Sequence, residues 1–142
     1  MTAHSMTDSK NAEVKKEKKE KKAKQDNTVD KSISYGTAYI YAIATSFSDS
    51  ICYMTDVQRI DSAYFTGKGM FLGGIKEYVR QFNGHLVDAG AKGRTVTVFF
   101  DKKLKDAEKR YLKLRRRYST SAKYDLRPVI KDQFAFSVVS PE

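Results

Sequence analysis

The sequence is poor in the residues that build disulfides, metal centres and histidine-based catalytic sites. Among its 142 residues, Cys52 is the single cysteine, and His4 and His85 are the two histidines. One thiol excludes an internal disulfide framework and a cysteine-based zinc site. Neither histidine has an obvious Cys or Asp partner, which argues against a histidine dyad or a histidine-based metal site. We therefore expect no metal and no cofactor.

Long apolar runs are also missing. The longest, at 38–44 (AYIYAIA), is far shorter than the roughly 20 residues that a membrane-spanning helix needs. The first residues lack the apolar segment of a secretory signal. These absences predict a cytoplasmic protein that does not bind a membrane.

Positive charge, by contrast, is abundant: 27 Lys and Arg face 17 Asp and Glu, a formal net charge of +10. Residues 1–31 hold 9 Lys, 6 acids and no aromatic residue, and 15–24 reads KKEKKEKKAK. Such a segment cannot bury enough apolar area to offset its ordering entropy, although Lys, Glu and Ala favour a helix. We expect a tail that is disordered or conditionally helical. It would act as a solvated segment or as an electrostatic arm for phosphates or an acidic protein surface.

Residues 32–142 are expected to form one domain, with 18 basic and 11 acidic residues. The hydrophobic patterns predict strands at 37–44, 51–58, 95–100 and 134–139. They predict helices at 70–82, ending at Asn83-Gly84, and at 102–118, capped by Asp101. Residues 59–69 read as a polar connection, and 95–100 as a central strand. The order β-β-α-β-α-β predicts an α+β two-layer sandwich: about four mostly antiparallel strands with two helices on one face.

The strongest chemical signal lies on the second predicted helix. Nine cations fall within it, and only Asp106 and Glu108 oppose them: Lys102, Lys103, Lys105, Lys109, Arg110, Lys113, Arg115, Arg116 and Arg117. Such a surface attracts polyanions, and Arg suits bidentate contact with phosphate. An acidic protein surface is the other candidate partner. The alternative without a binding function is a solvated helix face whose long side chains cover the sheet edge.

Other candidate sites are weaker. Tyr39, Tyr41 and Tyr53 would form a base-stacking platform if one sheet face were open to solvent. The glycine-rich run at 67–74 leads into a helix but matches neither phosphate-binding fingerprint, so we interpret it as a flexible helix entry. Three acids could gather near a hairpin end and bind a divalent metal, although turn and exposed-strand roles explain them better: Asp49, Asp56 and Asp61.

The segment Tyr39-Ile40-Tyr41, followed by Cys52-Tyr53-Met54-Thr55, resembles the hairpin of GIY-YIG nucleases. In that family two tyrosine-bearing strands precede a catalytic Arg and a later metal-binding Glu. The resemblance implies Arg59 and Glu77 for these roles, but Met54 stands where a Gly is expected, and only about 25 residues are covered.

The sequence thus predicts a non-catalytic basic domain that binds nucleic acid, RNA more than DNA, or another polyanion through helix 102–117. The alternative is an assembly subunit, a homo- or hetero-oligomer. It would pair through a sheet edge at 37–44 or 134–139, and the tail would order on a partner. A degenerate GIY-YIG-like nuclease is a remote third hypothesis.

Overall fold

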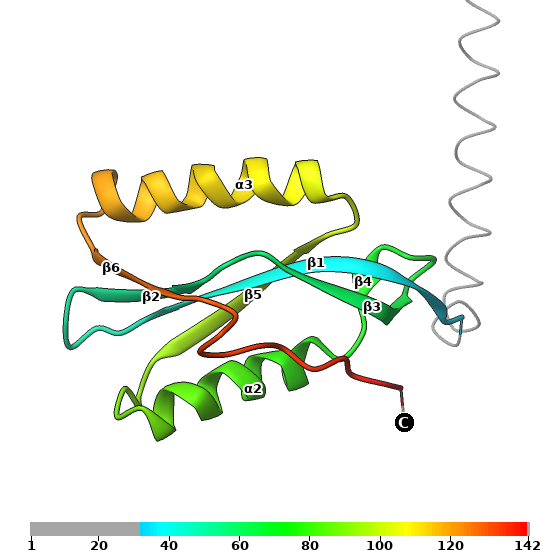
Figure 1. Ribbon diagram of the computed structural model, residues 1–142, viewed down its shortest axis with the longest axis horizontal. Helices are drawn as coiled ribbons and strands as arrows, with labels where there is room; N and C mark the ends of the chain where they lie inside the picture. The colour runs from blue at the N-terminus through cyan, green and yellow to red at the C-terminus, as the bar shows by residue number, and fades with distance from the viewer. Residues whose placement is uncertain (1–31, 142) are drawn as a thin grey trace, which may run out of the picture.

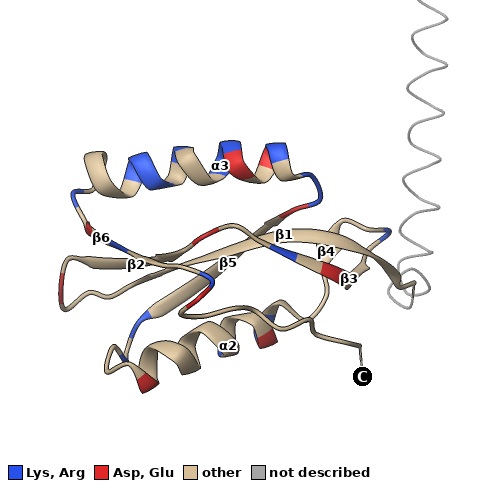
Figure 2. Ribbon diagram, viewed as in Figure 1, with Lys and Arg blue, Asp and Glu red and all other residues tan. Residues whose placement is uncertain are grey.

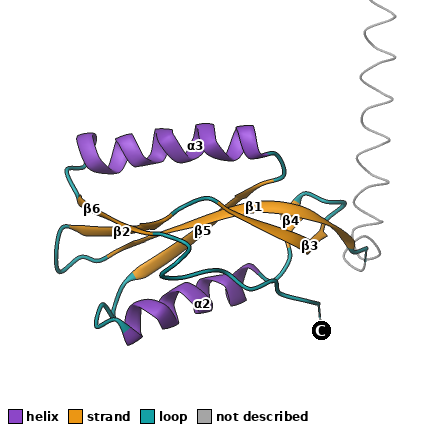
Figure 3. Ribbon diagram, viewed as in Figure 1, coloured by secondary structure: helices purple, strands orange, loops and turns teal. Residues whose placement is uncertain are grey.

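A computed structural model describes residues 32–141, so the predicted tail at 1–31 lies outside the described residues. The strands are β1 (Ser34–Thr45), β2 (Ile51–Thr55), β3 (Gln58–Thr66), β4 (Phe71–Leu72), β5 (Thr95–Asp101) and β6 (Asp125–Val129). The helices are α2 (Ile75–Asp88) and α3 (Leu104–Arg116), and a π-helical turn, Arg117–Ser121, continues α3. The α+β class with a mostly antiparallel sheet is confirmed (Figure 3).

Strand β1 is the centre of the sheet. On one side it pairs with β3 along its first part and with β2 near its end, and on the other side with β5, all antiparallel. Strand β6 adds to β2 in parallel, and the short β4 adds to β3. The segment 37–44 is therefore the most internal part of the sheet, and the prediction that it forms a pairing edge is wrong.

The two helices cover opposite faces of the sheet, so the prediction that both lie on one face is wrong (Figure 1). Ile40 belongs to the larger core, together with the buried residues of α2, whereas Tyr41 belongs to a second core with α3. The run 38–44 is apolar at every position, which is typical of a strand buried on both faces rather than on one. The fold thus has three layers, with the sheet in the middle.

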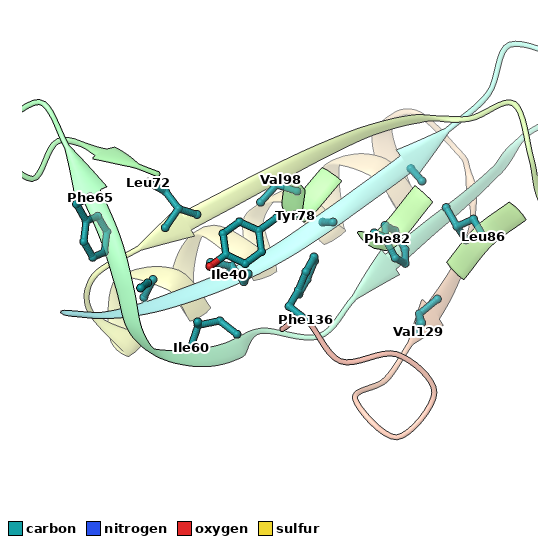
Figure 4. Packing of buried hydrophobic residues seen from close by; sticks show 14 of the residues in the cluster. Ile40, Ile60, Phe65, Leu72, Tyr78, Phe82, Leu86, Val98, Val129 and Phe136 are labelled. Carbon is teal, nitrogen blue, oxygen red and sulfur yellow. The ribbon is translucent and has the colours of Figure 1, made fainter. Parts of the chain in front are cut away.

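The larger core lies between α2 and the sheet. Tyr78, Phe82 and Leu86 point from α2 toward the sheet, where Ile40 of β1 lies (Figure 4). The alanines of β1 belong to the same core, and their small side chains leave room for the aromatic rings. The ring centroids of Tyr78 and Phe136 are 5.9 Å apart, edge to face. The C-terminal segment therefore contributes directly to this core.

The C-terminal segment differs most from its predicted form. Residues 134–139 form no strand; they run extended beside α2 and are held by side chains (Figure 1). Buried Gln58 donates from Nε2 to the carbonyl of Phe134 and accepts from the amide of Phe136, both at 2.9 Å. Gln81 makes a similar pair of bonds to the backbone of Ser137. Side-chain amides thus provide the backbone hydrogen bonds that a neighbouring strand would otherwise supply.

Several element bounds also differ from prediction. Residues 58–66 form strand β3 rather than a polar loop, because Ile60, Ala63 and Phe65 face the larger core. Helix α2 continues through Asn83-Gly84 to Asp88, since Gly84 is exposed and helical packing on either side outweighs its propensity. Asp101 ends β5, and Lys103 is the N-cap of α3. Strand β5 is an edge strand of the described sheet, not a central one.

Candidate functional site

Helix α3 is fixed to the sheet by one narrow face. Ala107 is fully buried, while Tyr111, Leu114 and the following Tyr118 pack against the smaller core. The Tyr41 ring stacks on Phe99 at 5.3 Å and meets Tyr111 edge to face at 5.1 Å. Because these contacts fix one side of the helix, its other sides face solvent.

All nine predicted cations are exposed. Six of them lie on α3, Lys102 and Lys103 directly precede it, and Arg117 begins the π-helical turn that follows it (Figure 2). Four of them follow each other at steps of four, four and three residues and form what we call the crest: Lys105, Lys109, Lys113 and Arg116. At 1.5 Å per residue the crest extends over about 16 Å. Within residues 32–141 none of the four has an ion pair.

Arg110 and Lys102 make contacts within the domain. The Arg110 guanidinium lies 5.1 Å from the Phe99 ring centroid, donates to the Phe100 carbonyl at 3.4 Å and approaches the Asp101 carboxylate at 3.7 Å. The Lys102 ammonium lies 4.7 Å from the Phe65 ring centroid. These two cations therefore have structural roles that the crest residues lack.

Two acidic residues, Asp106 and Glu108, interrupt the positive surface. Asp106 shares a shallow hollow of about 180 Å³ with Lys109, Arg110 and Lys113. This volume is below the roughly 300 Å³ of ordinary small-molecule pockets, and the hollow is open. The helix thus presents an extended charged surface rather than an enclosed ligand site.

Burial raises the pKa of side chains beneath the N-terminal half of α3. It raises the pKa of Asp101, an effect that the nearby Arg110 charge opposes. Burial also raises the pKa of Tyr41 to about 12, and the Tyr41 hydroxyl has no hydrogen-bond partner among the described residues. Tyr41 is therefore a core residue that stays protonated.

The predicted tyrosine platform is wrong. Tyr41 is fully buried under α3, and Tyr53 packs against the larger core on the opposite face of the sheet. Both faces are occupied by helices, so no open aromatic face remains at these residues.

Arg94 is a prominent charged residue that sequence reasoning missed. Its side chain is only 7% exposed; it binds both carboxylate oxygens of Asp49, at 3.0 and 2.6 Å, and donates to the Ile51 carbonyl. Its guanidinium lies 5.0 Å from the Tyr53 ring centroid. It anchors the β1–β2 turn to the start of β5, a contact that no local pattern signals.

The residues considered for catalysis or metal binding are not brought together. Arg59 lies opposite Tyr39 on the α3 face and pairs with Asp61, whereas Glu77 lies on α2, beyond the other face. Asp49 binds Arg94, and Asp56 binds Gln58 and the Lys131 amide. Within residues 32–141 no three His, Cys, Asp or Glu side chains gather as a metal site. No helix in this range has the length and apolar character to cross a bilayer.

The glycine-rich run serves the fold. Gly67, Gly69 and Gly74 adopt left-handed backbone conformations, and a side chain at Gly73 would collide with the Tyr64 ring. The run forms the turn before β4 and the start of α2, as the interpretation of a helix entry expects.

Comparison with known proteins gives no match: no protein-family model, no curated protein sequence and no solved structure is significantly similar to this chain.

Proposed function

We propose that the exposed surface of α3 binds a polyanion, and that nucleic acid, RNA ahead of DNA, is its first candidate. The observation that carries the proposal is the crest: four exposed cations in register on a helix whose opposite side is anchored in a core. The domain needs none of these four side chains for its packing, unlike Arg110 and Lys102.

The composition of the exposed face suits contact with phosphates more than recognition of adenine edges. Between 104 and 116 it carries no Asn or Gln, the side chains that pair with adenine in a major groove. Recognition of double-stranded RNA depends largely on shape, phosphates and 2′-hydroxyls, which gives RNA precedence. The proposed setting is the cytoplasm, and the protein is proposed to act without catalysis.

Fluorescence anisotropy tests the proposal with labelled RNA and duplex DNA at several salt concentrations. The proteins are the full chain, a chain starting at Ser32, and a crest variant with Lys105, Lys109, Lys113 and Arg116 all changed to Gln. If each residue neutralises one phosphate, the crest variant lowers the slope of log affinity against log salt by roughly 3. The chain starting at Ser32 separates any contribution of residues 1–31.

A charge-matched control separates a site from general attraction. Four exposed lysines elsewhere are changed to Gln, which also lowers the net charge from +10 to +6: Lys68, Lys76, Lys92 and Lys131. We expect this control to retain most of the salt dependence. Equal losses in the two variants would refute the crest as a site. No binding of the full chain at low salt would refute the nucleic-acid proposal and leave an acidic protein as the partner.

A further inference from the structure

The edges of the sheet are protected unequally. Strand β4 has two residues, and β6 carries Pro128 between charged and apolar neighbours, so both are poor templates for another strand. Strand β5 has seven residues without Pro, Gly or a bulge, and its first six carry no charge. Within the described residues it pairs with β1 alone.

The backbone groups that β5 leaves free can be assigned. Ala42 donates its amide to Thr55 Oγ1 at 2.8 Å, on the side of β1 away from β5, and Ala42 lies opposite Val98. In an antiparallel pair both residues then point their amides and carbonyls away from each other. Arg110 reaches the Phe100 carbonyl from outside the sheet, which agrees with this alternation. Val96, Val98 and Phe100 therefore direct their backbone groups outward, and of these the Phe100 carbonyl already accepts from Arg110.

The side chains beside this edge differ between the two faces. On the α2 face Val79, Val96 and Phe100 are only partly buried, so apolar surface of the larger core remains uncovered. On the α3 face Arg110 lies over Phe99, and Lys113 and Arg117 follow it on the same side of the helix, at three and seven residues. Two acids lie on this side: Asp106, one turn before Arg110, and Asp101, whose carboxylate is 3.7 Å from the Arg110 guanidinium.

We propose that the free edge of β5 binds an extended segment of a partner protein by strand addition, with acidic side chains toward α3 and apolar side chains toward α2. Charge repulsion argues against a second copy of this chain as the partner. Pairing of two β5 strands around a twofold axis would bring the cationic flanks of both α3 helices together. An acidic strand instead pairs with these cations while its backbone uses the free groups of β5.

The test uses the ¹⁵N-labelled full chain and a capped nine-residue peptide in which Glu alternates with Val and Thr. We expect hydrogen exchange to slow at least tenfold at the amides of Val96, Val98 and Phe100 when the peptide binds. The amides of Thr97 and Phe99 already face β1 and should change little. A peptide with a central Pro is the matched negative control, because it cannot continue a strand ladder.

Two variants test the backbone contact directly. Val96→Pro removes one outward amide without breaking the β1 ladder, and we expect it to weaken peptide binding about fivefold or more. Val96→Thr keeps the amide and should stay within twofold. Both variants should bind RNA as the parent does, so failure here is distinguishable from failure of the crest. The exchange pattern of the parent decides the question if Val96→Pro unfolds.

Three results would overturn the proposal. The first is absence of peptide binding. The second is equal binding of the Pro-interrupted peptide with shifts confined to α3, which indicates charge attraction alone. The third is protection of the same three amides without peptide, rising with protein concentration, which assigns the edge to a second copy.

Discussion

Gln58 offers a sharp test of how the C-terminal segment is held. Its side-chain amide is buried, only 2% of the residue is exposed, and it bonds to the backbone of Phe134 and Phe136. The change Gln58→Met keeps the length of the side chain and removes both bonds, together with the bond from Nε2 to Asp56 Oδ1. The amide of Phe136 would then lie in the core without a partner, since Phe136 is itself only 6% exposed.

The magnitude follows from the two backbone groups left behind, because the Asp56 carboxylate still accepts from the Lys131 amide. An unsatisfied buried amide or carbonyl costs about 1–3 kcal/mol, and the apolar Met side chain recovers part of this. We expect the free energy of unfolding to fall by about 2–3 kcal/mol. For a domain of this size, that lowers the melting temperature by roughly 10 °C. Gln81→Met removes an equivalent pair of bonds to exposed Ser137, where water substitutes, so it should cost less than about 1 kcal/mol.

Urea unfolding followed by far-UV circular dichroism measures both variants, and hydrogen exchange at Phe136 and Ser137 reports the segment itself. A loss below about 1 kcal/mol for Gln58→Met would refute the reasoning. Equal losses of stability in the two variants would refute it as well, because the bonds of Gln58 are buried and those of Gln81 reach exposed Ser137.

Three further predictions concern buried or paired charged and titratable groups. Arg94→Met should destabilise the domain by about 1–3 kcal/mol in urea unfolding, because the Ile51 carbonyl loses its donor and Asp49 its partner; an unchanged midpoint would contradict this. Since burial raises the pKa of Asp101 in the folded state, its ionisation costs stability as pH rises above its unfolded value. Asp101→Asn should therefore be more stable than the parent at pH 7 and should lose that advantage below about pH 4 in melts across pH; a constant difference would refute the sign. Burial also raises the pKa of the Cys52 thiol to about 11, so iodoacetamide should modify it far more slowly in the native protein than in urea; equal rates would show that the site opens freely.

Local patterns were sufficient for the parts of the fold that repeat within a short window. The stripe of Ala107, Tyr111 and Leu114 predicted α3 and the exposure of its cations, because helical spacing alone separates the two faces. The strands predicted at 37–44 and 95–100 also lie within β1 and β5.

Features that depend on contacts distant in sequence could not be predicted in this way. The two helices cover opposite faces of the sheet because the strand at 38–44 is buried on both of its faces. Periodicity alone does not distinguish such a strand from one that is buried on a single face. The apolar alternation at 134–139 suggested a strand, yet Gln58, 78 residues before Phe136, provides the hydrogen bonds instead. Arg94 pairs with Asp49 across 45 residues, so its burial has no local signal.

The position of β1 between two cores has a consequence for how the chain can be divided. β1 and the strands that follow it, β2 and β3, come early in the chain, whereas β5 and α3 come after residue 94. A fragment that ends in the loop at 90–93 would leave Tyr41, Ile43, Cys52 and Met54 bare on one face. Each half of the chain would therefore expose what the other covers, and nascent chains must avoid association until α3 has emerged. The domain is expected to be indivisible: it folds when β5 joins β1 and not before.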